Sequence, residues 1–189
     1  LFSGGVDAYA TYFKNLRTTS DLVLIRGAEI PVDDIEQWKR AKANIESEEI
    51  LAGNEKHFIT MNCREFYSYK VVELINGGSW WGFVQHGMSL ICALAPLSFK
   101  LGYGVIRIAA THNTEFRMFW GSMPEIDENI KWADTKIMHD GFDMSRMDKV
   151  ELIVNHAKFL GKNFTVRVCY SEFNSDINCS KCEKCLRTM

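Results

Sequence analysis

The stretch of sequence that decides the fold is Leu1-Phe2-Ser3-Gly4-Gly5-Val6-Asp7-Ala8. Leu1 and Phe2 are predicted to end a buried strand, and the glycine turn opens a helix on which Val6, Ala10 and Phe13 share one face. Paired glycines let a backbone turn sharply and approach a ligand closely. Free N–H groups and the dipole at a helix start favour an anion. The stretch therefore predicts a strand, a phosphate-binding turn and a helix.

Strands and helices alternate along the rest of the chain. Apolar runs predict strands at 22–25, 57–61 and 105–110, and residue spacing predicts helices at 33–52, 84–101 and 148–160. This alternation is typical of an α/β fold with a parallel sheet covered by helices on both faces. Such folds bind ligands at the carboxyl ends of the strands, which here means the loops after Phe2, Ile25 and Ala110.

Residues 74–99 carry no formal charge and are long enough to raise the question of a membrane span, which takes about 20 residues. Polar residues, glycines and a proline interrupt the stretch. The regular spacing of Leu90, Leu94, Leu97 and Leu101 instead predicts a buried helix with these four residues on one face. No membrane association is expected.

Composition places the chain among ordinary globular proteins. Its 189 residues are 47% hydrophobic and 24% charged, which excludes disordered and collagen-like classes and allows one domain with a small appendage. Lys plus Arg number 22 against 24 Asp plus Glu, so no overall basic charge recruits nucleic acid. Because the chain opens on Leu1 and not on Met, we expect residue 1 to lie inside a longer protein.

The acidic residue of the turn, Asp7, narrows the choice of ligand. The turn lacks the Gly-Lys-Ser/Thr of a Walker A loop and the spacing of the dinucleotide fingerprint. A carboxylate beside a phosphate is repulsive unless a divalent cation lies between them, so Asp7 predicts Mg²⁺. The alternative is a plain strand-to-helix turn in which Asp7 caps the helix.

The cysteines cluster at the other end of the chain. Of six, four follow the pattern C-x9-C-x2-C-x2-C, at Cys169, Cys179, Cys182 and Cys185. Four thiolates at such spacing are typical of a structural Zn²⁺ site. An iron–sulfur cluster and disulfide or redox chemistry are the alternatives. Clustering at one end of a larger chain differs from a secreted disulfide scaffold and indicates a reducing, cytoplasmic compartment.

Ser3, Gly4, Gly5 and Asp7 resemble the Ser-Gly-Gly-x-Asp-Ser signature of the PP-loop family of ATP pyrophosphatases, with Ala8 in place of the final serine. The resemblance implies an adenine nucleotide alpha hydrolase-like fold of the HUP type. It also implies ATP as cofactor, adenylation of a substrate oxygen, release of pyrophosphate, and displacement of AMP by a nitrogen or sulfur nucleophile.

The two ends together resemble the 7-cyano-7-deazaguanine synthase branch of that family, which works in queuosine biosynthesis. Residues 146–153 resemble its Lys-led helix, so Lys149 would reach a phosphate; a solvated helix residue is the alternative. The resemblance implies Asp7 and Lys149 as catalytic residues, and a position after the third predicted strand adds His112. The expected ATP contacts are Leu1, Phe2, Ser3, Gly4, Gly5, Val6, Asp7, Ala8, Arg26, Gly27 and Lys149, together with Thr111, which is added for the same reason of position.

The middle of the chain departs from this branch. Thr111-His112-Asn113 follows the third strand, where His112 could serve as a general base or the triplet could simply cap a turn. His86 is interpreted as structural, and Trp81 as either core or a stacking surface.

The expected function is that of an ATP-dependent ligase or amidotransferase. Its partners would be a small-molecule carboxylate and ammonia or an amine, in a chain that could form homo-oligomers. The alternatives are amidation of a sugar or cell-surface precursor, tRNA thiolation, or a degenerate ATP-binding module. We predict a PP-loop domain at 1–165 and a zinc-binding segment at 166–189.

Overall fold

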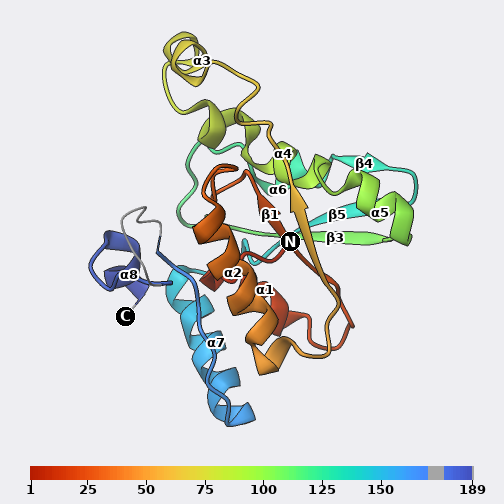
Figure 1. Cartoon of the computed structure of the whole chain (residues 1–189), viewed down its shortest axis with the longest axis vertical. Coiled ribbons are helices and arrows are strands. Elements are labelled where there is room, and N and C mark those ends of the chain that lie inside the picture. Colours follow the sequence, from red (N-terminus) through yellow and green to blue (C-terminus); the bar gives the residue numbers. More distant parts are fainter. Residues whose placement is uncertain (170–176, 189) are drawn as a thin grey trace.

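The computed structural model describes residues 1–169 and 177–188 (Figure 1). Its strands are β1 (Leu22–Arg26), β2 (Lys56–Thr60), β3 (Val105–Ala109), β4 (Lys131–Trp132) and β5 (Thr135–Asp140). Its α-helices are α1 (Val6–Lys14), α2 (Ile35–Ser47), α3 (Tyr69–Asn76), α4 (His86–Cys92), α5 (Ala95–Leu101), α6 (Pro124–Asp127), α7 (Arg146–Leu160) and α8 (Glu183–Thr188). Two shorter helical turns are η1 (Glu49–Leu51) and η2 (Trp81–Gln85).

The strands form two small sheets joined by the amino-terminal segment. β1 pairs with β2 in parallel, β3 pairs with β5 in parallel, and β4 lies antiparallel to β5. The nitrogen of Leu1 donates a hydrogen bond to the Arg107 carbonyl and that of Phe2 donates to the Val23 carbonyl, each at 2.8 Å. Leu1 and Phe2 therefore lie between β1 and β3, so the glycine turn leaves from the middle of the strand array.

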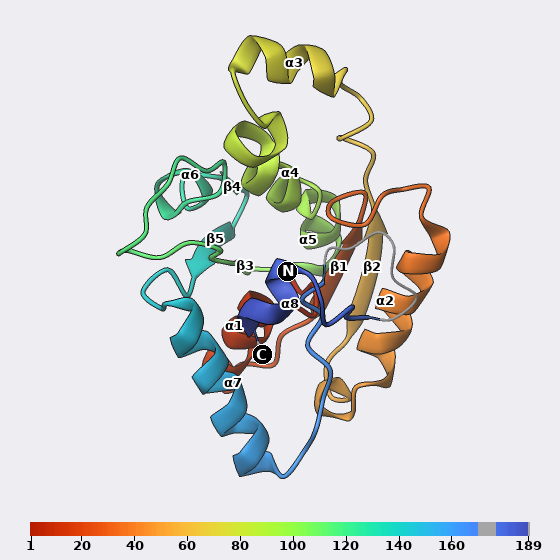
Figure 2. The same ribbon diagram turned by 90° about the vertical axis from the view of Figure 1, so that its left-hand side faces the viewer.

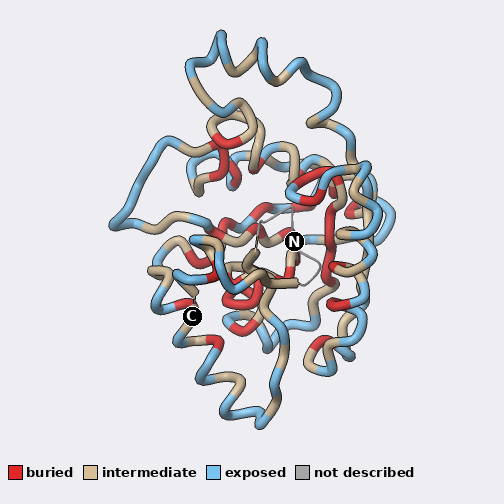
Figure 3. The backbone as a smooth tube through the Cα atoms, turned by 60° about the vertical axis from the view of Figure 1, so that its left-hand side comes forward, coloured by how far each residue is buried: buried red, intermediate tan, exposed pale blue. Residues whose placement is uncertain are grey.

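Helices cover both faces of β1, because its side chains alternate between two apolar clusters. Leu22 and Leu24 belong to a cluster with residues of α1, α2 and α7. Val23 and Ile25 belong to a second cluster with residues of α4, β3 and β5. In Figure 3 the buried stretches of backbone lie mostly in the interior of the molecule, while the projecting parts are exposed. The predicted mixed α/β arrangement with parallel strands is confirmed, while the HUP-type assignment stays a prediction.

Local capping explains where two helices begin. The Asp34 side chain accepts a hydrogen bond from the Gln37 N–H at the start of α2. Ser145 and Asp148 form a reciprocal capping box, so α7 begins two residues before the predicted 148. Gly161, in the left-handed conformation, ends α7.

The apolar stretch predicted as one helix over 84–101 is broken. η2 leads into α4, and α5 starts separately at Ala95 with Pro96 in its first turn, where a missing N–H costs nothing. Leu94 is buried and Leu90 and Leu97 pack on the core, but Leu101 is 43% exposed, so its placement on the buried face was wrong. Among the described residues, Trp81–Leu101 is long and apolar enough to cross a membrane. Within it, Ile91 and Leu94 are buried in the core of the molecule.

Five of the α-helices and strands were not predicted, and two of them, α6 and α8, are helices of only four and six residues. α3 projects from the rest of the molecule and none of its residues is buried (Figures 1 and 3). β5 alternates buried and exposed residues, but its inward positions include the polar Thr135 and His139, which hid the pattern. The two-residue β4 is too short for any periodicity to show.

Candidate functional site

A cavity of about 720 Å³ opens where the glycine turn, the loop after β3, α7 and α8 meet. Its lining includes Ser3, Gly5, Asp7, Glu29, Trp81, His86, Thr111, His112, Trp120, Arg146, Lys149, Arg167, Cys169, Lys184 and Arg187. It lies at the carboxyl end of β3, as expected for this class of fold. The structure therefore brings together the glycine turn, Thr111, His112 and Lys149.

The glycine turn is held open by its own backbone and by the chain that follows α7. Gly4 has a φ of +74°, a conformation that suits glycine. Its carbonyl accepts a hydrogen bond from the Arg167 N–H at 2.7 Å, and a Cβ on Gly5 would lie 3.3 Å from the Arg167 carbonyl. The second glycine thus permits a close approach of residue 167 to the turn.

Asp7 is the centre of an ion-pair group. Its Oδ1 accepts a hydrogen bond from Lys149 Nζ at 2.9 Å, and its Oδ2 accepts one from Arg146 at 3.2 Å. Lys149 is 3% exposed and also donates to the Ala110 carbonyl at 2.5 Å. The alternative that Lys149 is a solvated helix residue is therefore wrong.

The ion pairs change the case for magnesium. Asp7 was expected to need Mg²⁺ because a carboxylate repels a phosphate, yet both of its oxygens have cationic partners. The negative charge is already compensated by Arg146 and Lys149. Mg²⁺ at Asp7 stays a prediction, but repulsion between the Asp7 carboxylate and a phosphate no longer supports it.

The cavity is positively charged in a chain whose net charge is −2. Five cationic side chains line it, from Arg146, Lys149, Arg167, Lys184 and Arg187, against the carboxylates of Asp7 and Glu29. Arg167 also donates to the Ser3 carbonyl at 3.2 Å and to Glu29 at 3.3 Å. A concave surface with an excess of one sign of charge concentrates ligands of the opposite sign, so this cavity suits an anion.

Aromatic and imidazole rings form another wall. The His86 ring centroid lies 5.3 Å from those of Trp81 and Trp120, and Trp120 lies 5.4 Å from His112. Burial lowers the pKa of both His86 and His112, which favours neutral rings near neutral pH. His112 is thus available as a proton acceptor, and the interpretation of His86 as purely structural missed its place in the cavity wall.

Arg26 and Gly27 have structural contacts outside this cavity. An Arg26 N–H donates to the Val32 carbonyl. Gly27 has a φ of +89°, and a Cβ there would lie 1.7 Å from the Met61 carbonyl oxygen. Their predicted contact with ATP stays a prediction. Leu1, Phe2 and Ala8 line a smaller cavity of about 120 Å³ beneath the turn.

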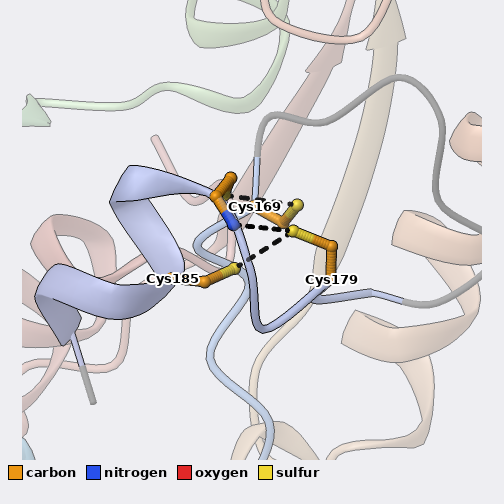
Figure 4. A group of neighbouring side chains, drawn as sticks. Cys169, Cys179 and Cys185 are labelled. Carbon is orange, nitrogen blue, oxygen red and sulfur yellow. Dashed lines mark hydrogen bonds between the residues drawn. The ribbon is translucent and has the colours of Figure 1, made fainter.

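The four carboxy-terminal cysteines form one cluster, in which Cys169, Cys179 and Cys185 converge in Figure 4. All four Sγ atoms lie within 4.8 Å of one another, with 3.8 Å between those of Cys169 and Cys182 and 3.9 Å between those of Cys179 and Cys185. A tetrahedron with Zn–S bonds of about 2.3 Å has sulfur atoms about 3.8 Å apart. The cluster could therefore hold a metal such as zinc.

Backbone donors prepare part of this cluster for thiolate chemistry. N–H groups of Lys181 and Cys182 lower the pKa of Cys179 to about 6, and the Cys185 N–H lowers that of Cys182. Burial raises the pKa of Cys185 to about 12. A bound dication would favour the thiolate at that position, since metal ligation deprotonates a cysteine.

The sequence interpretation missed Arg146 and Arg167 as partners of the glycine turn. Arg146 lies three residues before Lys149, on the same helix face, and this spacing was an available signal. Arg167 lies in an irregular segment without periodicity, so only its position in space reveals its role.

Comparisons of the chain with protein-family models, with curated proteins and with solved structures found no match.

Proposed function

We propose that this chain binds ATP in the large cavity and belongs to the class of PP-loop ATP pyrophosphatases. The observation that carries the proposal is the Lys149–Asp7–Arg146 group at the start of α1, directly beside the glycine turn. N–H groups at a helix start and two cations suit a polyphosphate. We further propose an ATP-dependent ligase similar to the 7-cyano-7-deazaguanine synthase branch.

The proposed reaction has two steps. A carboxylate oxygen of the acceptor attacks the α-phosphorus of ATP, the bond between the α-phosphorus and its bridging oxygen breaks, and pyrophosphate leaves. An amine nitrogen then attacks the acyl carbon, AMP leaves, and the amine gives up a proton. Arg146 and Lys149 would stabilise the phosphate charge, and neutral His112 would accept the proton.

Zinc would have a structural role in this proposal. With its four sulfur atoms in one cluster, the four-cysteine group offers a closed tetrahedral site and no open position for a substrate. The same clustering counts against tRNA thiolation by a pair of the terminal cysteines, because a bound metal would engage all four of them. The degenerate-module alternative rests on Ala8, because alanine has no hydroxyl to offer a phosphate. Its side chain is 5% exposed and packs in the core.

Product analysis tests the function. The full chain is incubated with ATP, ammonium and either 7-carboxy-7-deazaguanine or a sugar acid, and nucleotides and phosphates are quantified. AMP and pyrophosphate in equal amounts, dependent on one carboxylate, support a ligase. ADP with orthophosphate would contradict it, and ATP binding without turnover would favour the degenerate module.

A matched pair of variants on α7 tests the site. Lys149→Gln removes a buried cation at Asp7, and we expect it to lower AMP formation by about 100-fold. Lys158→Gln removes an exposed cation from the same helix and should leave the rate unchanged. Equal rates in the two variants would sink the assignment of Lys149.

A further inference from the structure

The cysteine module, residues 177–188 together with Cys169, contributes directly to the wall of the cavity. Cys169, Lys184 and Arg187 all line it, so a cysteine of the cluster and side chains of α8 face the same space as the glycine turn. Figure 1 shows α8 near the start of α7, and in the turned view of Figure 2 α8 is drawn in front of α1. A module that only braced the fold would not need cations in this position.

A chain of hydrogen bonds fixes which face of α8 looks inward. Arg146, the partner of Asp7, also donates to Thr188 Oγ1 at 3.2 Å, and that hydroxyl donates to the Lys184 carbonyl at 2.9 Å. Arg187 and Thr188 lie three and four positions after Lys184, so each is its neighbour on the surface of the helix. The face of α8 that carries Lys184 and Arg187 is therefore the face turned toward Asp7.

Arg187 has a competing contact that is easily given up. Its guanidinium lies 3.1 Å from Glu183 on the same helix, and both side chains are more than half exposed. Exposed pairs of this kind contribute about 0–1 kcal/mol. An anion in the cavity with several negative charges offers a stronger partner than this one carboxylate.

We propose that Lys184 and Arg187 are ligand-binding residues, which contact the anionic, phosphate-bearing part of the molecule held in the large cavity. The inference rests on the proposed function for the identity of that anion, a di- or triphosphate. Arg146 and Lys149 hold one side of it from α7, and the cysteine module closes over the other side. The four-cysteine centre thus positions two binding residues as well as cross-linking the chain.

The rival explanation is that these cations only offset the negative charge of a metal–thiolate centre. Lys181 distinguishes the two explanations, because it lies between the cysteine ligands, is exposed and is absent from the cavity lining among the described residues. Charge compensation at the cluster would require Lys181 as much as Lys184. Ligand binding requires Lys184 and Arg187 but not Lys181.

The test is calorimetric titration of inorganic pyrophosphate, and separately of ATP, into the full chain. The proteins are wild type, Lys184→Gln, Arg187→Gln and the control Lys181→Gln, each checked for metal content per chain. We expect about tenfold weaker binding for Lys184→Gln and Arg187→Gln, since each loses a charge-assisted contact. Lys181→Gln should bind as wild type does, and all four should retain the same metal content.

The outcomes separate this inference from the proposed function. If Lys184→Gln and Arg187→Gln bind like Lys181→Gln while Lys149→Gln binds weakly, the inference fails and the proposed function stands. Metal loss in Lys184→Gln alone would also overturn direct binding, because the cation would then be supporting the cluster. If wild type binds neither pyrophosphate nor ATP, the proposed function fails and the inference with it.

Discussion

The two ends of the chain line one cavity but are held in place by different forces. The amino-terminal turn is followed by Tyr9, which is fully buried, and by Phe13, which is 3% exposed; both pack in a cluster of aromatic rings. In the described residues 177–188, only Cys185 is buried. Apolar burial therefore fixes the glycine turn, whereas the carboxy-terminal segment depends on its thiols and on a few polar contacts, such as those of Asn178.

This contrast follows from size. Segments below about 40 residues bury too little apolar surface to hold a fold and usually need a metal or disulfides. The cysteine module is such a segment, and the core around α1 is not. One half of the cavity should therefore persist without metal, while the other half should need it.

The largest expected effect is that of Cys185→Ser. This residue is 2% exposed and supplies one of four sulfur ligands, and structural zinc contributes about 10–16 kcal/mol to small zinc peptides. We expect the variant to lose the one zinc ion per chain that the four-cysteine site predicts, with helix content largely retained. Metal analysis and far-ultraviolet circular dichroism measure both.

Cys92→Ser is the control, because Cys92 is exposed and lies outside the cluster. Equal zinc content in Cys92→Ser and Cys185→Ser would contradict the metal site. Collapse of the whole helix signal in Cys185→Ser would contradict the independence of the core around α1.

Next in size is Gly27→Ala. A Cβ there would strike the Met61 carbonyl, and φ is +89°, so we expect a loss of roughly 3 kcal/mol or more in the free energy of unfolding. Gly104→Ala, where a Cβ meets open space, should change it by less than about 0.5 kcal/mol. Urea unfolding provides the measurement. Similar midpoints for the two variants would show that β1 can shift to make room.

Tyr9→Phe, on α1, should have a smaller effect on the free energy of unfolding, and one of opposite sign. The Tyr9 hydroxyl is buried and has no hydrogen-bond partner among the described residues, so Tyr9→Phe should stabilise the protein by about 1 kcal/mol. The Tyr12 hydroxyl lies 3.0 Å from both the Ile50 carbonyl and Asn54 Oδ1, so Tyr12→Phe should destabilise it by about 1 kcal/mol. Thermal or urea unfolding of the pair checks the signs. A loss of stability in Tyr9→Phe would indicate a buried partner for its hydroxyl.

The free energy of unfolding should also depend on pH. Burial lowers the pKa of His86 and His112 in the folded chain, so the unfolded chain binds protons first, near pH 6.5. The free energy of unfolding should be full above that pH and fall as the pH drops toward the folded pKa, by at most about 1.4 kcal/mol per pH unit for each histidine. Urea unfolding at pH 7.5, 6.5 and 5.5 measures this. The pH dependence should be weaker in His112→Gln, and an unchanged dependence would contradict the cause.

Most of the local structure followed from the sequence, and the failures have physical causes. The strands at 22–25, 57–61 and 105–110 were found because each is a short apolar run. The helix after the glycine turn was found because its apolar residues repeat at the helical period. β5 was missed because His139 points inward, where it pairs with buried Asp127 at 2.7 Å. Polarity alone therefore suggested a surface position for a histidine that is buried and hydrogen-bonded.

The sequence by itself determined the α/β class, the glycine turn and the spacing that brings four cysteines into one cluster, because each depends on residues close together in the chain. Only the tertiary structure decided that Arg146 and Lys149 both pair with Asp7, and that α8 turns Lys184 and Arg187 into the same cavity. Those contacts join residues more than a hundred positions apart. They depend on how the helices pack, and the spacing of residues within one helix or strand does not show this.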